Sequence, residues 1–157
     1  MDEFDKRILR SLQADGRMSV NELSEQIGLS PTPVSRRIKN LEQSGVISGY
    51  AAVIDEAALG YEVSVFVSVQ LDKQIDEALV KFETALEDLD EVVDCWLMTG
   101  NRDYLLRVAT TGLRDFEKFL VGRLTKIKGV ASIESSIPLR RVKAGQSRVP
   151  RLASQSE

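Results

Sequence analysis

The stretch that decides the fold runs from Ser19 to Gly45 and reads SVNELSEQIGLSPTPVSRRIKNLEQSG. Ser19 and, three residues later, Glu22 form a capping box, the signature of a helix N-terminus. The apolar residues that follow recur at helical spacing: Val20, Leu23 and Ile27. Gly28 ends this helix, and another begins only a few residues later. Two helices joined by so short a turn predict a helix-turn-helix.

The start of the later helix has two candidate N-caps, Ser30 and Thr32, because prolines follow both of them. Thr32 precedes Pro33 and is therefore biased away from helical backbone angles, which slightly favours Thr32. Upstream, Phe4, Ile8 and Leu12 predict a further helix on one face. Each of the three helices is followed by a glycine, which suits a left-handed C-terminal position: Gly16, Gly28 and Gly45.

Beyond the three helices the spacing of the apolar residues changes from helical to extended. Val46 to Ile54 reads as a short extended segment, and strict alternation from Glu62 predicts a strand. Helical and extended patterns then follow one another: a helix over 76–89, strands over 92–99 and 104–110 around a tight connection at 100–103, a helix over 113–128 and a last strand from 130 toward 139. The order βαββαβ is ferredoxin-like.

The predicted fold class is therefore α+β, with a three-helix, winged-helix-like domain joined to a ferredoxin-like domain. The predicted divisions are a helix-turn-helix domain over 1–49, a linker with a short strand over 50–61, a ferredoxin-like oligomerisation domain over 62–139, and a mobile basic tail over 140–157. One sheet face of the second domain carries no helix. That face holds large side chains such as Phe66 and Trp96. The simplest way to shield them from water is self-association of the chain.

The outward face of the third helix predicts DNA contact. Val34, Ile38 and Leu41 must face the small core, which leaves cations and short hydroxyls outside. Arginine can grip guanine or phosphate, and the helix N-terminus offers free N–H groups to phosphate. The alternative is that these charged side chains only form the water-facing side of an amphipathic helix. The predicted DNA-binding residues are Ser30, Thr32, Pro33, Ser35, Arg36, Arg37 and Lys39.

Composition restricts the chemistry. The 157 residues include no histidine and a single cysteine, Cys95, which excludes an intramolecular disulfide, a zinc site built on His and Cys, and a catalytic triad that needs a histidine. We also expect no metal, no cofactor and no catalytic residue. The absence of a long apolar run and the acidic start Met1-Asp2-Glu3 favour a cytoplasmic protein with no membrane partner. The predicted DNA contact adds the expectation that it is nucleoid-associated. Net charge is −3, yet residues 1–49 are balanced, 50–137 are acidic and 138–157 are basic, which indicates different partners for different parts.

On specific motifs the chain resembles the Lrp/AsnC (leucine-responsive and asparagine regulator) family of transcription factors. The resemblance covers about residues 2–139. The motifs that carry it are Asp5-Lys6-Arg7-Ile8-Leu9, Leu12-Gln13-Ala14-Asp15-Gly16-Arg17, Glu22-Leu23, Gly28-Leu29-Ser30-Pro31-Thr32-Pro33-Val34, Arg37-Ile38, Leu41-Glu42, Gly45-Val46-Ile47-Ser48-Gly49-Tyr50, Gly100-Asn101-Arg102-Asp103-Tyr104-Leu105-Leu106 and Gly129-Val130.

The resemblance implies a regulator that binds double-stranded DNA at a near-palindromic operator and forms homodimers that assemble further, often to octamers. It also implies a small-molecule effector, commonly an amino acid, held between subunits. By similarity the effector-binding residues are Gly100, Asn101, Arg102, Asp103, Tyr104, Ser135 and Ser136. The family's loop commonly has an acid where this chain has Asn101, which leaves the identity of the effector open. The alternative for the loop is a plain hairpin turn with Tyr104 in the core.

Two other functions compete with an effector-controlled regulator. Siroheme decarboxylases resemble this family in both domains, but a chain without histidine and with a basic third helix fits that enzyme chemistry poorly. A nucleoid architectural protein without an effector is the other alternative.

Overall fold

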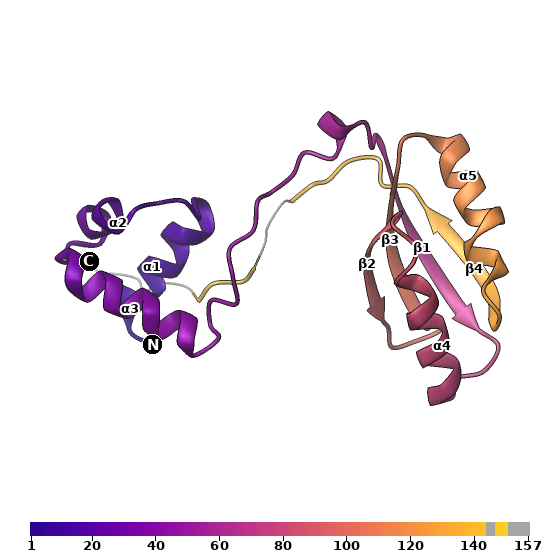
Figure 1. Cartoon of the computed structure of the whole chain (residues 1–157), viewed down its shortest axis with the longest axis horizontal. Coiled ribbons are helices and arrows are strands. Elements are labelled where there is room, and N and C mark those ends of the chain that lie inside the picture. Colours follow the sequence, from indigo (N-terminus) through magenta and orange to yellow (C-terminus); the bar gives the residue numbers. More distant parts are fainter. Residues whose placement is uncertain (144–146, 151–157) are drawn as a thin grey trace. The chain divides into compact units, whose positions relative to one another are not determined.

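The computed structural model describes residues 1–143 and 147–150. The predicted basic tail therefore lies in part outside the described residues, at 144–146 and 151–157. The chain divides into two compact units: Met1–Val53 together with the C-terminal residues from Val142, and Ile54–Arg141 (Figure 1). No helix in the described part of the chain is both long and apolar enough to cross a membrane.

The first unit holds three helices: α1 (Glu3–Ala14), α2 (Val20–Ile27) and α3 (Pro31–Gln43). The capping box predicted for α2 is confirmed, since the Ser19 hydroxyl accepts the amide of Glu22 and the Glu22 carboxylate accepts the amide of Ser19. A core of five buried apolar side chains holds the helices together: Ile8, Leu23, Ile27, Val34 and Leu41.

Two sequence-based expectations about this unit were wrong in detail. Helix α3 begins at Pro31 with Ser30 as its N-cap, so Thr32 lies inside the first turn. A proline fixes φ near its helical value, which suits the first helical position. Gly28 and Gly45 have positive φ as expected, whereas Gly16 does not, because α1 already ends at Ala14 with an extended Asp15.

The linker also differs from expectation. Residues 46–61 contain no strand, so the short strand expected in this region is absent. A short 3-10 helix, η1 (Ala57–Leu59), lies further along the linker. The extended pattern of Val46 to Ile54 has no neighbouring strand to complete its backbone hydrogen bonds, and a lone strand is not stable.

The second unit is a four-stranded antiparallel sheet with two helices on one face (Figure 1). The strands are ordered β2-β3-β1-β4, as a ferredoxin-like βαββαβ chain requires. In chain order the elements are β1 (Val63–Leu71), α4 (Asp76–Leu86), β2 (Val92–Leu97), β3 (Tyr104–Thr110), α5 (Leu113–Gly122), η2 (Leu124–Lys126) and β4 (Val130–Ser136).

Some of these elements are shorter than the sequence indicated. Helix α5 ends at Gly122 and continues only as the 3-10 turn η2, because glycine is a poor helix former. Strand β4 ends at Ser136 rather than near Leu139, because Pro138 has no N–H for the ladder.

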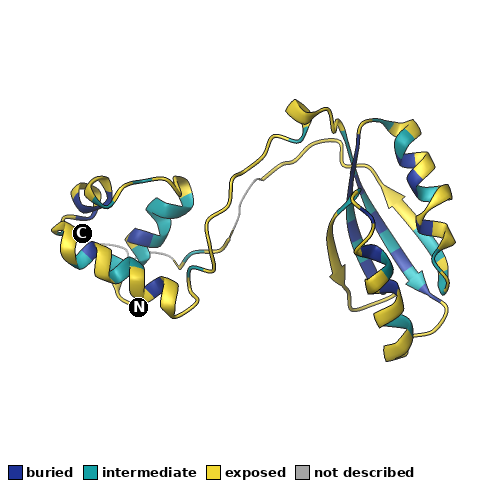
Figure 2. Ribbon diagram, in the orientation of Figure 1, coloured by how far each residue is buried: buried dark blue, intermediate teal, exposed yellow. Residues whose placement is uncertain are grey.

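The core of the second unit lies between the sheet and the helices, and the opposite sheet face is open. Alternate β1 residues are fully buried under the helices, and Phe82 and Phe119 pack there from α4 and α5 (Figure 2). On the open face, Phe66 lies opposite Arg107 and Trp96 lies opposite Leu105. Trp96 is 44% exposed, so this chain alone does not cover that surface.

Candidate nucleic-acid interface and ligand site

The outward face of α3 is open. Ser30, Thr32, Ser35, Arg36 and Lys39 are exposed, and Pro33 is partly buried. Among the residues that the structure describes, neither Arg36 nor Lys39 is within ion-pair distance of a carboxylate. Two cations and three hydroxyls therefore face solvent along one side of the helix.

The N-terminus of α3 is also available for an anion. The Ser30 side chain makes no capping hydrogen bond, so its hydroxyl is not used to close the helix. Amides in a first helical turn have no acceptor inside the helix, which leaves the N–H of Thr32 without one. The positive end of the helix dipole lies at the same place. This combination suits a phosphate group.

Arg37 lies differently from the other predicted DNA-binding residues. Its Nη1 is 2.7 Å from an Asp5 carboxylate oxygen and 2.8 Å from one of Asp2, and its guanidinium lies 5.5 Å from the centre of the Phe4 ring. The hydrogen bond to Asp5, with that to Asp2, raises the pKa of Arg37 against the opposing effect of desolvation. Arg37 therefore connects α3 to the N-terminus of α1, and its contact with DNA stays a prediction.

Sequence reasoning missed the acidic partners of Arg37, although a signal was present. Asp2 is the N-cap of α1, and Asp5 three residues later completes a capping box. Acids in this pattern mark the start of a helix. The pattern places both carboxylates at one helix end, where a single guanidinium can reach them.

The predicted effector loop connects β2 and β3. The Met98 amide donates to the Asp103 carbonyl at 2.8 Å and closes the loop. Gly100 has φ +109, a conformation that favours glycine, and Gly100 and Asn101 are exposed. The exposed part of the loop can therefore present polar groups to a ligand.

Asp103, which belongs to the same motif, already makes hydrogen bonds inside the protein. Asp103 is 5% exposed, and its carboxylate accepts the Leu71 amide at 2.7 Å and the Gln74 side-chain amide at 2.6 Å. Asp103 thereby ties the loop to the end of β1. Its effector role stays a prediction, since the ligand would have to share or displace these donors.

Tyr104 belongs to the core. Its hydroxyl donates to a Glu83 carboxylate oxygen at 2.7 Å, and its ring lies 4.7 Å from that of Phe82, centre to centre. Burial, followed by the bond to Glu83, raises the pKa of the Tyr104 phenol well above its usual value. In this structure the Tyr104 side chain is therefore part of the core, which is the alternative that the sequence allowed. Its contact with an effector stays a prediction.

Arg102 forms a polar cluster on the open sheet face that sequence reasoning did not find. Its guanidinium donates to Ser132 Oγ at 2.6 Å, to Gln70 Oε1 at 3.3 Å and to a Glu134 carboxylate oxygen at 3.0 Å. The alternation of β1 and β4 puts these partners on one face, but their convergence on Arg102 depends on strand register.

Within one chain the loop and the predicted serines are not brought together. Tyr104 at the end of the loop pairs with Val69, whereas Ser135 and Ser136 pair with Val67 and Phe66. That offset of two to three residues along β1 corresponds to roughly 7–10 Å. The combination of the loop and these serines in one effector site stays a prediction.

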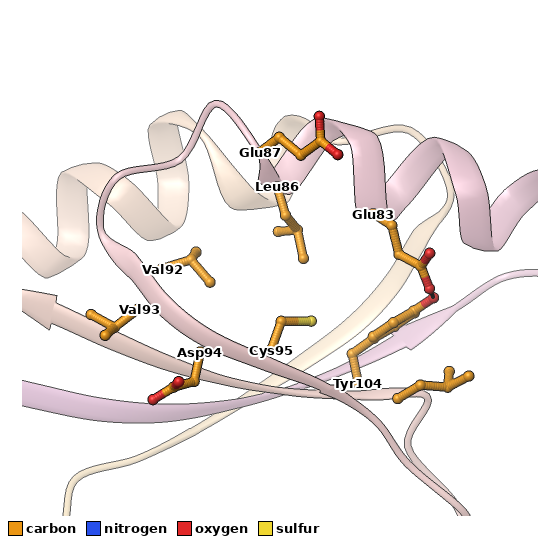
Figure 3. Close-up of a pocket in the computed structure, with 9 residues that line it drawn as sticks. Glu83, Leu86, Glu87, Val92, Val93, Asp94, Cys95 and Tyr104 are labelled. Carbon is orange, nitrogen blue, oxygen red and sulfur yellow. Dashed lines mark hydrogen bonds between the residues drawn. The ribbon is translucent and has the colours of Figure 1, made fainter. Parts of the chain in front are cut away.

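A cavity of about 360 Å³ lies between α4 and the edge strand β2 (Figure 3). Leu86, Val92 and Tyr104 line it, and the Cys95 side chain lies on the side of its strand that faces the pocket. Burial raises the pKa of the Cys95 thiol to about 11, so it is protonated and a weak nucleophile at neutral pH. In the described part of the chain no group of acidic or cysteine side chains is arranged to hold a metal ion.

Family models match both units. The Lrp/AsnC ligand binding domain matches residues 64–147, and a winged helix-turn-helix DNA-binding domain matches residues 1–48. The Bkd operon transcriptional regulator of Pseudomonas aeruginosa is 44% identical, over 90% of this chain and 93% of its own length. The leucine-responsive regulatory protein of Escherichia coli is 36% identical, over 91% of this chain and 87% of its own.

Solved structures agree with the fold. A transcriptional regulator from Neisseria meningitidis in complex with L-Met superposes with a TM-score of 0.89 at 33% identity, covering 94% of this chain and 96% of its own. Escherichia coli AsnC superposes with a TM-score of 0.83 at 28% identity, covering 96% and 99%. The predicted α+β class, with an N-terminal winged helix-turn-helix domain and a C-terminal regulatory domain, is confirmed.

Proposed function

The chain belongs to the Lrp/AsnC family of DNA-binding transcriptional regulators, and from that premise we propose that α3 reads a near-palindromic operator under the control of an amino acid. The observation that supports this most strongly is the outward face of α3, where Arg36 and Lys39 have no carboxylate partner among the described residues. Exposed cations and hydroxyls on a helix in the major groove can contact phosphates and base edges.

A homodimer would present two copies of α3 to successive major grooves, about 34 Å apart, which is the reason for expecting a near-palindromic operator. The open sheet face with Phe66 and Trp96 is the surface we propose for pairing, because apolar groups there have no cover from their own chain. Further assembly of dimers, to octamers by family resemblance, would bring several DNA-binding units onto one stretch of chromosome in the cytoplasm.

The effector site is proposed at the loop between β2 and β3. Backbone amides near Gly100 can receive a carboxylate, and Ser135 and Ser136 of another subunit would complete the site. The Neisseria relative in complex with L-Met supports an amino acid as the ligand class. Such a ligand controls DNA binding only by its different affinity for two assembly states.

The relatives that the chain matches are regulators rather than enzymes, and we propose no catalytic role. The function is tested by binding of the full-length protein to the DNA upstream of its own gene, at stated salt, with a shuffled duplex as the control. We expect preferential binding to the upstream DNA, and a change in its affinity on addition of at least one amino acid. Equal affinity for both duplexes would contradict a sequence-specific regulator. Specific binding that no amino acid alters would favour the effector-free architectural alternative.

A further inference from the structure

The C-terminal segment Ser147–Pro150 lies against the DNA-binding unit. The side-chain amide of Gln13 donates to the Ser147 carbonyl at 2.6 Å, and Arg10 Nη2 donates to the Pro150 carbonyl at 3.0 Å. Both donors come from α1. The two hydrogen bonds fix the backbone of the segment at its two ends, in a stretch that the sequence predicted to be a mobile tail.

A groove on the DNA-binding unit receives this segment. The groove and the segment together line a hollow of about 270 Å³, with α1 on one side and the residues after α3 on the other. Val149 is partly buried there, while its neighbour Arg148 is exposed. The apolar lining comes from Leu9, Leu12 and Ile47. Val149 is therefore the residue of this segment that the unit covers most.

The docked segment changes how the two units are connected. The chain leaves the first unit after Val53 and returns to it at Val142, so two covalent segments join the units. If Ser147–Pro150 were not bound to the first unit, the segment that follows Arg141 would be a free C-terminal end and would not connect the units. Contacts that are weak by themselves suffice to hold it, because a tethered segment has a high effective concentration.

We propose that the groove between α1 and the residues after α3 is a docking site for Ser147–Pro150 of the same chain, and that this docking preorganises the DNA-binding unit for a two-half-site operator. The inference rests on the function proposed above. A second connection that is anchored at Ser147–Pro150 reduces the orientations open to the unit, so less orientational freedom is lost when both DNA-binding units of a dimer bind at once.

Docking is tested by cross-linking, without DNA. Ser48 and Ser147 line the same hollow, so Ser48→Cys and Ser147→Cys are combined in a Cys95→Ser background, which removes the chain's own cysteine. We expect a short bis-maleimide to join the two cysteines within one chain. A variant with only one of the two cysteines should form no cross-link within the chain. Cross-links between chains would overturn docking in the same chain, and absence of any cross-link would overturn docking itself.

The preorganisation is tested with Val149→Ser, and its matched control is Val142→Ser, a tail valine that is 81% exposed. For Val149→Ser we expect about three- to tenfold weaker binding to a duplex with two half-sites and unchanged binding to a duplex with one. The control should match the wild type on both. An equal loss on both duplexes would show that the segment only stabilises the fold, and no loss on either would also overturn the proposal.

Failure of the underlying function gives a different result from failure of this inference. If the wild-type protein binds no duplex specifically, the regulator assignment fails, while the cross-link still reports whether the segment docks. If the wild type binds its operator and the cross-link does not form, only the docking is wrong.

Discussion

The cations on the outward face of α3 differ from three arginines of the sheet unit in how they are paired. In the DNA-binding unit, Arg36 and Lys39 are exposed on α3 and no carboxylate pairs with them in the described part of the chain. In the sheet unit, three arginines are paired: Arg102 with Glu134, Arg107 with Asp94 and Glu56, and Arg123 with Glu91. A count of charges in the sequence does not distinguish these cases. What decides whether a cation can bind a phosphate is whether the fold has already paired it.

The largest expected effect is on DNA binding. Replacing both free cations, as Arg36→Ala with Lys39→Ala, removes two contacts each worth about 1–3 kcal/mol. Operator affinity should therefore fall by about 30-fold or more, with the melting temperature nearly unchanged. A gel-shift titration together with a thermal melt measures both. Arg114→Ala, which removes one exposed positive charge from α5, is the control for charge loss away from α3 and should keep wild-type affinity. Wild-type affinity in the double variant would remove α3 from the interface.

Asp103→Ala separates a structural from a ligand-binding carboxylate. The change leaves the buried Leu71 amide without its acceptor, which costs about 1–3 kcal/mol of the free energy of unfolding. Urea denaturation should show the loss in the absence of any amino acid. Asn101→Ala, on the exposed part of the same loop, is the control and should unfold like the wild type. If Asp103→Ala left stability unchanged, Asp103 would not be the tie between the loop and β1.

Arg37→Ala sharpens the contrast within α3 itself. Loss of the partly exposed pairs to Asp2 and Asp5 and of the contact with Phe4 should lower the free energy of unfolding by about 1–2 kcal/mol. DNA affinity, measured well below the melting temperature, should change less than in Arg36→Ala. The reverse pattern, unchanged stability with a large loss of affinity, would show that Arg37 contacts DNA.

The smallest effect concerns pH. The hydrogen bond from the Asp5 amide, together with Arg37, lowers the pKa of Asp2 below its ordinary value of 3.8. A lowered folded-state pKa gives stability that is complete above about pH 4 and is lost as pH falls toward the lowered value. Asp2→Asn should therefore flatten the decline of melting temperature below pH 4 and leave its pH dependence near neutrality unchanged. An identical acid profile in the two proteins would show that Asp2 contributes no such stability.

The parts of the structure that the sequence predicted well are those that depend on local pattern. The capping box at Ser19 and Glu22 and the strand Tyr104–Thr110 are determined by residues a few positions apart. The partners of Arg37 and Arg102 lie about 30 residues away in the chain, so no local periodicity reveals them. The docking of Ser147 on Gln13 joins residues 134 positions apart and was not predictable either. Composition indicated a basic tail correctly but not its contacts.

The central claim is that the cations left free on α3 bind DNA phosphates or bases, and the salt dependence of operator binding tests it most directly. Each cation that neutralises a phosphate contributes about 0.9 to the slope of log affinity against log salt concentration. Arg36→Ala should lower the magnitude of this slope by about 0.9, and Arg114→Ala should leave it unchanged. Equal slopes for Arg36→Ala and the wild type, accompanied by equal affinities, would contradict the account.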